Sequence, residues 1–254
     1  MATAHGLARD GGVQRAGGPL STPEPTTRAV RWGLGDVAIT FGLTLLLGLA
    51  SVLLVTPLFP DTADGKAWAS VAMLMLPWLG LAGWPLLATA TRGNGPVADL
   101  RLRVTWRQAG VGVGGGIVAY LAAWGIAILT EKISGHTLSS AVGNIAQDTT
   151  SASRAALTVL ALSAAVGAPI VEEIAFRGLF YGALERRAIP ALSAVVGTGT
   201  AFALFHFEPL RFALLLAIGL VLGTVRARTG STGASILTHM TVNLPGALAL
   251  LALR

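Results

Sequence analysis

Seven long apolar runs occupy almost the whole chain after residue 31. They cover residues 37–58, 67–90, 109–130, 155–181, 189–207, 211–225 and 231–253. A helix of about 20 apolar residues crosses the hydrocarbon core of a bilayer. Because a helix satisfies its own backbone hydrogen bonds in lipid, each run is predicted to be a transmembrane helix. The expected fold is therefore all-α, a polytopic membrane helix bundle of about seven transmembrane helices.

The composition also indicates a membrane protein. The mean hydropathy is +0.69 and only 12% of the residues are charged, whereas soluble domains carry about 25%. Residues 1–31 differ, because they are rich in Gly, Ala, Pro, Thr and Arg and have no hydrophobic period. This segment is predicted to be a disordered N-terminal arm, and residues 32–254 form the transmembrane domain.

Basic residues predict the orientation of the bundle. If the N-terminus is cytoplasmic, the alternating segments between the runs place 12 Lys and Arg residues in the cytoplasm and 5 outside. Such a bias marks the cytoplasmic side, so we expect the N-terminus inside and the C-terminus outside a cell membrane. The Ala-, Gly-, Arg- and Val-rich composition is typical of a bacterial protein, which favours a bacterial plasma membrane. The basic residues in the predicted cytoplasmic segments account for the net charge of +6. No nucleic-acid partner is therefore expected.

Pairs of glycines four residues apart predict where helices pack closely, because both members share one face. These pairs are Gly112 with Gly116, Gly178 with Gly182, and Gly219 with Gly223. Glycine is abundant in the chain, so we interpret the pairs as packing within one molecule rather than as a dimer signal.

Three charged residues lie inside the fourth run, where each costs about 2.5–3.5 kcal/mol on insertion scales. Glu173 and Arg177 are four residues apart and can form an ion pair on one helix face. Glu172 points elsewhere and is expected to be an unpaired carboxylate in the bilayer. The alternative interpretation is a three-residue salt-bridge cluster that only holds helices together.

Two histidines lie within later runs. His206 follows Phe202 by four residues, and Asn243 follows His239 by four, so each pair shares a helix face. Alone, each pair is typical of interhelical hydrogen bonding. Together with the carboxylates they indicate a functional site. A carboxylate and imidazoles can activate water, and an amide and an imidazole can stabilise an oxyanion. These groups suit peptide-bond hydrolysis by water.

At these residues the chain resembles the CPBP intramembrane proteases, named for CAAX proteases and bacteriocin-processing enzymes and also called the abortive-infection family. The family has three motifs in order: Glu-Glu-x-x-x-Arg, Phe-x-x-x-His, and His-x-x-x-Asn or a similar residue in place of the Asn. All three are matched here, by the six residues above together with Phe202. The resemblance covers about residues 155–250, the motif core of the transmembrane protease domain.

The resemblance implies a role for each residue. Glu172 would be the general base, and His206 would share its water or bind a metal. His239 and Asn243 would stabilise the tetrahedral oxyanion. The ion pair of Glu173 and Arg177 would hold Glu172 in place.

The cofactor is left open at this point. Glu172, His206 and His239 could supply a three-ligand catalytic zinc site with one open position. A metal-free glutamate mechanism is equally compatible, because the chain has no His-Glu-x-x-His helix. The absence of cysteine rules out a thiolate zinc site and a cysteine nucleophile.

The expected function is an intramembrane endopeptidase that hydrolyses a peptide bond in a membrane-associated protein or peptide, with membrane lipid and that substrate as partners. Two alternatives remain. One is a proton-coupled membrane transporter, since intramembrane Glu and His residues also relay protons. The other is a catalytically silent scaffold or immunity protein on the same fold.

The predicted helix boundaries place the candidate site residues at different depths in the membrane. Counting along the runs puts Glu172 and His239 slightly to the cytoplasmic side and His206 toward the outer side. The mismatch in depth is roughly 15–20 Å at 1.5 Å per residue. Tilt, or a kink near Gly167-Ala168-Pro169, would reduce it. Otherwise the fifth run has different boundaries.

Overall fold

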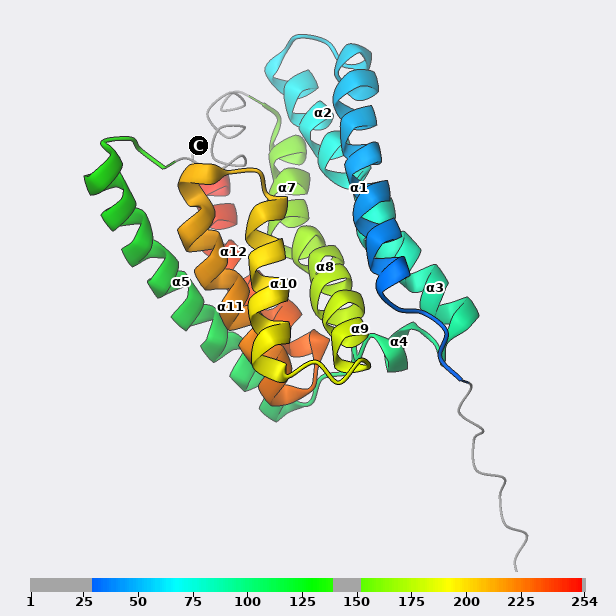
Figure 1. Ribbon diagram of the computed structural model, residues 1–254. Coiled ribbons are helices and arrows are strands. Elements are labelled where there is room, and N and C mark those ends of the chain that lie inside the picture. The colour runs from blue at the N-terminus through cyan, green and yellow to red at the C-terminus, as the bar shows by residue number, and fades with distance from the viewer. Residues whose placement is uncertain (1–28, 139–151, 253–254) are drawn as a thin grey trace, which may run out of the picture.

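A computed structural model describes residues 29–138 and 152–252, and within them it is a bundle of helices without strands (Figure 1). The arm predicted at 1–31 falls outside the described residues, except for 29–31. The elements, in chain order, are α1 (Leu34–Val55), η1 (Thr56–Leu58), α2 (Ala63–Met75), η2 (Leu79–Gly83), α3 (Trp84–Arg92), α4 (Pro96–Asp99), α5 (Trp106–Ser134), α7 (Arg154–Leu162), η3 (Ser163–Gly167), α8 (Ala168–Glu173), η4 (Ile174–Phe180), α9 (Tyr181–Glu185), α10 (Ala191–Phe205), η5 (Pro209–Arg211), α11 (Phe212–Thr229) and α12 (Thr232–Ala252).

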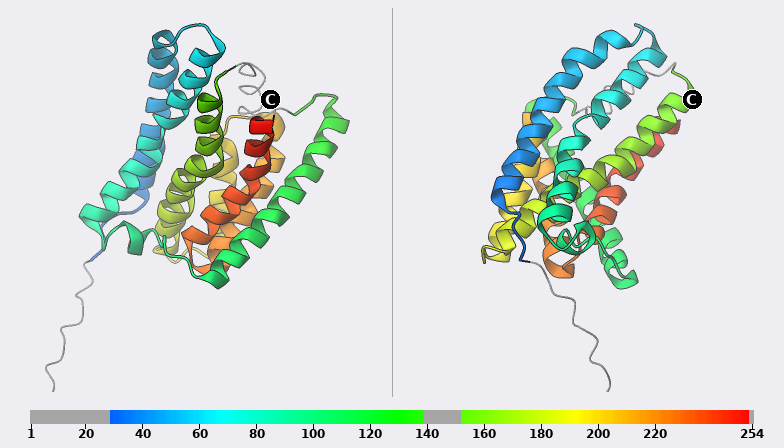
Figure 2. Two further views of the ribbon diagram at one scale, coloured as in Figure 1. Left: turned by 180° about the vertical axis from the view of Figure 1, so that it is seen from behind. Right: turned by 90° about the vertical axis from the view of Figure 1, so that its right-hand side faces the viewer.

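Six helices of the described chain are long and apolar enough to cross a membrane. They cover Leu34–Leu58, Ala63–Arg92, Trp106–Ser134, Arg154–Glu185, Pro209–Thr229 and Thr232–Ala252. The chain is thus a multi-pass membrane protein, as predicted. The remaining expected helix, at 189–207, is the shorter apolar helix α10. Successive segments run in alternating directions, and α10 supplies the pass between α9 and α11 (Figures 1 and 2).

The two ends of the bundle are named here by the chain termini that lie at them. The N-terminal face carries residues 29–33, the connection from α3 to α5, and the turns before α10 and before α12 (Figure 1). The C-terminal face carries the turn between α1 and α2, residues 135–138, η5 and the end of α12.

Helix α10 is shorter than the hydrocarbon core of a bilayer. Its 15 residues extend only about 22 Å at 1.5 Å per residue, less than the roughly 30 Å of a hydrocarbon core. The helix ends because Phe207 has a left-handed backbone (φ 55°) and donates its N–H to the carbonyl of Leu204. The ring of His206, which directly follows α10, and the ring of His239 both contact the Phe202 ring, with centroids 4.6 and 5.5 Å from it. The two imidazoles therefore lie closer together than a depth mismatch of roughly 15–20 Å would allow.

The span Arg154–Glu185 is interrupted by two π-helical turns. η3 (Ser163–Gly167) precedes α8, and η4 (Ile174–Phe180) follows it. Pro169 lies in the first turn of α8, where its missing N–H is tolerated. Turns of this kind are often found at functional sites. Here they bracket the helix that carries Glu172 and Glu173.

Glycines allow several helices to pack closely. A Cβ added at Gly112 would lie 2.6 Å from the carbonyl oxygen of Ala234, where α5 meets α12. A Cβ at Gly219 of α11 would lie 2.8 Å from the carbonyl oxygen of Gly199 in α10. The glycine pairs therefore serve packing within one chain, as predicted.

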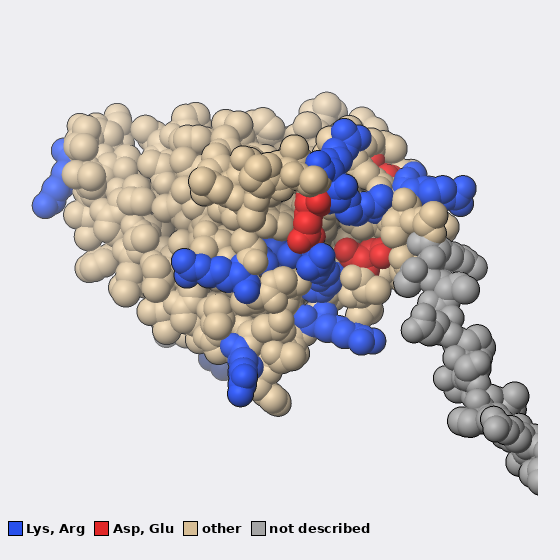
Figure 3. Space-filling view, turned by 60° about the horizontal axis from the view of Figure 1, so that its bottom comes forward, with Lys and Arg blue, Asp and Glu red and all other residues tan. Residues whose placement is uncertain are grey.

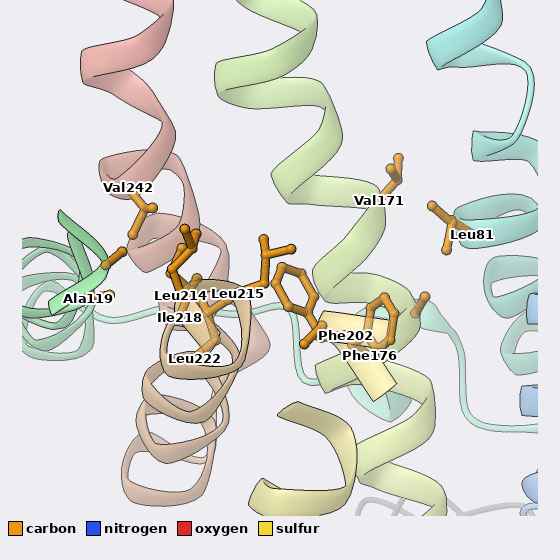
Figure 4. Packing of buried hydrophobic residues seen from close by; sticks show 13 residues of the cluster. Leu81, Ala119, Val171, Phe176, Phe202, Leu214, Leu215, Ile218, Leu222 and Val242 are labelled. Atoms are coloured by element: carbon orange, nitrogen blue, oxygen red, sulfur yellow. The ribbon is translucent and has the colours of Figure 1, made fainter. Parts of the chain in front are cut away.

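Aromatic rings fill the centre of the core. Phe176 of η4 and Phe202 of α10 meet edge to face, with ring centroids 5.4 Å apart. Both are about 1% exposed, and they lie next to Leu215 and Leu222 of α11 (Figure 4). This layer lies on the N-terminal side of His206, because Phe202 is one helical turn nearer the start of α10.

Gly116 provides a test of this packing. A Cβ there would lie 2.7 Å from the carbonyl oxygen of Thr238, so Gly116→Ala is expected to destabilise the bundle by about 1–3 kcal/mol through overpacking. Gly114 lies on the same helix with nothing within 4 Å of an added Cβ. Gly114→Ala should therefore keep or raise the unfolding temperature measured in detergent. Equal midpoints for the two variants would contradict the contact between α5 and α12.

Candidate active site

A fully buried ion pair lies behind the site. Arg177 Nη1 donates to Glu173 Oε1 at 3.0 Å, and both side chains are 0% exposed. The second terminal nitrogen of Arg177 donates to the carbonyl of Gly219 at 2.7 Å. The guanidinium also lies 4.9 Å from the centroid of the Phe202 ring. The ion pair expected from the i, i+4 spacing is present, and it connects η4 to α10 and α11.

Arg226 extends this network and was not singled out by the sequence pattern. It is 1% exposed, its Nε donates to the carbonyl of Arg177 at 3.2 Å, and its Nη2 lies 3.4 Å from Glu185 Oε2. Arg101 reaches the same carboxylate at 3.0 Å. In the sequence Arg226 directly follows the apolar run 211–225, and the count of basic residues places it among the 12 on the cytoplasmic side. Its position three residues before the end of α11 was the available signal.

His239 lies between the two consecutive glutamates. Its Nδ1 is 3.1 Å from Glu173 Oε1, and its Nε2 is 3.9 Å from Glu172 Oε2. An ionised carboxylate only accepts hydrogen bonds, so the hydrogen of the neutral ring lies on Nδ1 and Nε2 faces Glu172 with a lone pair. The ion pair thus contacts His239 directly, and its expected role in holding Glu172 in place stays a prediction.

Glu172 keeps one oxygen unpartnered. Its Oε2 is buried and has no hydrogen-bond partner among the described residues, although the side chain as a whole is 19% exposed. A buried acceptor without a partner costs about 1–3 kcal/mol. A donor that enters beside Glu172 would recover this free energy.

His206 is fixed by its own helix. Its Nδ1 lies 2.7 Å from the carbonyl oxygen of Phe202, and because a carbonyl only accepts, Nδ1 is the donor and Nε2 keeps a lone pair. The Phe202 ring lies 4.6 Å from the ring of His206 and 5.5 Å from that of His239, measured between centroids. Phe202 therefore contacts both imidazoles, a role that its motif position did not reveal.

Asn243 is held by a π-helical turn. Its Nδ2 donates to the carbonyl of Ala164 in η3 at 3.0 Å. An amide nitrogen carries two hydrogens, so the second N–H of Asn243 is available to another acceptor.

A cavity of about 870 Å³ connects these groups. Four of the six predicted site residues line it: Glu172, His206, His239 and Asn243. The other two, Glu173 and Arg177, lie buried behind them. The rest of the wall is mainly apolar and includes Tyr120, Trp124, Leu214 and Leu215. The structure thus brings together residues from α8, η4, α10 and α12 around one apolar hollow.

The three residues suggested as zinc ligands, Glu172, His206 and His239, meet the requirements of a zinc site only in part. Both imidazoles use Nδ1 toward an oxygen acceptor, as metal-binding histidines commonly do. However, no group of three His, Cys, Asp or Glu side chains within 29–138 and 152–252 lies close enough to hold a metal ion. The chemistry below is therefore derived from the protein groups alone.

A comparison with known proteins relates the segment that forms this site to a protein family. Residues 154–245 match the family model described as type II CAAX prenyl endopeptidase Rce1-like. The match includes all six predicted site residues and leaves the first 153 residues uncovered. No curated protein and no solved structure matches the chain. Through the segment that forms its site, residues 154–245, this multi-pass membrane protein is similar to the Rce1-like family, which is consistent with the CPBP and CAAX proteases.

Proposed function

We propose that the protein is an intramembrane endopeptidase in which Glu172 activates the water that attacks a peptide bond. The observation that carries the proposal is the buried, unpartnered Oε2 of Glu172, which faces His239 across 3.9 Å in a cavity large enough for a peptide segment. The family match supports the same reaction class.

The first step places the water. One oxygen atom can lie about 2.8 Å from each of two groups that are 3.9 Å apart, which suits a water bridging Glu172 Oε2 and His239 Nε2. His206 presents a second lone pair to the same cavity. Glu172 takes a proton from this water while the water oxygen bonds to the substrate carbonyl carbon.

The second step stabilises the negative charge that develops on the carbonyl oxygen. Asn243 offers its remaining amide hydrogen. His239 keeps its hydrogen on Nδ1, toward Glu173, so its Nε2 accepts the second hydrogen of the water and holds the new hydroxyl group in place.

The third step breaks the peptide bond. The tetrahedral intermediate collapses, the carbon–nitrogen bond cleaves, and Glu172 returns its proton to the leaving amine. The products are a new carboxylate and a new amine, so one water is consumed for each bond. The carboxylate thus acts first as a base and then as an acid.

The cavity favours this function over transport. On the N-terminal side of the catalytic groups lie Phe176, Leu222 and the ion pair of Glu173 and Arg177, all of which are essentially unexposed. A transporter needs a path that reaches both faces, whereas these packed groups close the cavity on the N-terminal side. No specific observation favours a silent scaffold.

Glu172→Gln tests the base directly. We expect it to lower cleavage of a quenched fluorescent peptide library by about 100- to 10,000-fold, the range that general-base removal commonly gives. Asp61→Asn is the matched control, because it converts an exposed carboxylate (90% exposed) to an amide and should leave the rate unchanged. Full cleavage by Glu172→Gln would remove the mechanism.

The two neighbouring glutamates should differ in their effect on stability. Glu173→Gln leaves the buried Arg177 without its charge partner, and breaking such a pair costs about 3–5 kcal/mol. Glu172→Gln removes no hydrogen bond of Oε2 and is expected to leave the unfolding temperature in detergent unchanged or higher. Similar destabilisation by both variants would mean that Glu172 is also a structural ion-pair member.

Dependence on metal can be measured on the same protein. Because no three-ligand group is assembled in the described chain, cleavage is expected to survive chelation by EDTA and 1,10-phenanthroline. Metal content is measured alongside, in wild type and in His206→Ala and His239→Ala. Stoichiometric zinc that disappears together with activity in these variants would establish the metal mechanism instead.

A further inference from the structure

Two segments that are far apart in the sequence form one surface on the N-terminal face. The loop before α5 meets the turn before α12, where Ser231 Oγ donates to the carbonyl of Arg103 at 2.6 Å. In the first turn of α5, Gln108 Nε2 donates to the carbonyl of Thr229, the last residue of α11, at 2.9 Å. These hydrogen bonds hold the start of α5 against the end of α11, so side chains on the two segments keep fixed relative positions.

Three arginines project from these segments. Arg103 and Arg107 flank the start of α5, and Arg228 lies one residue before the end of α11. All three are exposed, and none forms an ion pair with another residue of the ranges 29–138 and 152–252. Together with Trp106, which lies between the first two, they are called the basic surface below.

The acidic residues of the same face do not compensate this charge. Figure 3 shows basic side chains gathered on the N-terminal face, with few acidic ones among them. The described carboxylates are engaged by other groups: Asp36 by Arg92, Asp99 by the indole N–H of Trp32, and Glu185 by Arg101 and Arg226. Three positive charges on the basic surface are therefore left without a counter-ion from the described chain.

Trp106 places the basic surface at the level of the lipid headgroups. It is the first residue of α5 and is 94% exposed. The 29 residues of α5 extend about 43 Å at 1.5 Å per residue, more than the roughly 30 Å of a hydrocarbon core and close to the 40–45 Å of a bilayer with its headgroups. Trp is enriched at this level because its ring is amphipathic. The arginines on either side of it then face lipid phosphates.

From the fixed positions of these arginines, their uncompensated charge and the depth of Trp106, we propose that the basic surface binds the headgroups of anionic phospholipids. Guanidinium groups donate paired hydrogen bonds to phosphate oxygens, and the indole ring lies against the glycerol and the first acyl carbons. Orientation of the bundle in the membrane requires only an excess of basic residues on one side. It requires neither the contact between the two segments nor the exposed ring. The proposal goes beyond the peptidase function and does not depend on it.

The basic surface is also close to a residue that supports the candidate site. Arg226, two positions before Arg228, is buried and donates from Nε to the carbonyl of Arg177 at 3.2 Å. A lipid that holds the end of α11 would therefore restrain this contact as well.

Lipid titration of the purified full-length protein tests the proposal. Phosphatidylglycerol and phosphatidylcholine with the same acyl chains are added separately in dodecyl maltoside at low ionic strength, and the unfolding temperature is measured. Phosphatidylglycerol is expected to raise it more than phosphatidylcholine. In the triple variant Arg103→Gln, Arg107→Gln and Arg228→Gln, the micellar fraction of phosphatidylglycerol at half-maximal effect should rise about 100-fold, because each Arg near an anionic surface contributes about a factor of five. Equal effects of the two lipids on the wild type would overturn the proposal.

A charge-matched variant and a soluble anion serve as controls. Lys132→Gln, Arg154→Gln and Arg187→Gln together remove the same charge from exposed positions elsewhere and should keep the preference for phosphatidylglycerol. Inorganic phosphate should not replace the lipid, because it offers nothing to Trp106. If the control variant loses the preference, or if inorganic phosphate stabilises the protein as well as phosphatidylglycerol does, the proposal fails. Should the first triple variant not fold, its three single variants, each expected to weaken the effect about fivefold, give the same test.

Discussion

The buried contact between Arg177 and Glu173 is the constraint on which the site depends. Neither charge is exposed, so each requires the other, and their remaining polar contacts reach Gly219 on α11 and His239 on α12. A single ion pair therefore fixes the relative positions of three helices. Since removing one partner of such a pair costs several kcal/mol, the arrangement resists sliding of these helices past one another. The positions of the candidate catalytic groups therefore depend on this buried ion pair, which lies behind them.

Adjacent glutamates have separate tasks because of helix geometry. Consecutive helical residues point about 100° apart, so Glu173 faces the ion pair while Glu172 faces the cavity. The two carboxylates then meet the two nitrogens of one imidazole, that of His239. Glu173 sets which nitrogen of the ring carries the hydrogen, and Glu172 lies within reach of the lone pair on the other nitrogen. A single glutamate at either position would leave one nitrogen of His239 without a carboxylate.

Much of this arrangement could be predicted from the sequence, because the signals are local. Apolar runs predict membrane helices from their own composition, and the spacing of Glu173 and Arg177 predicts their contact within one helix. The partner of Glu173 on another helix, His239, is 66 residues away, and no periodicity specifies it. Arg226 was missed for a similar reason. A basic residue at the end of an apolar run is normally solvated, and only tertiary packing reveals that it is buried.

The proximity of His206 to His239 could not be predicted from the apolar runs alone. Hydropathy continues through residue 207, but the backbone of Phe207 enters the left-handed region and ends α10 about 22 Å from its start. The Phe202 ring, one helical turn before His206, contacts both imidazoles, and counting along single runs does not reveal such a contact between helices. The end of α10 also leaves the space beyond it unfilled by that helix, and His206 and Leu214, on either side of this break, both line the cavity.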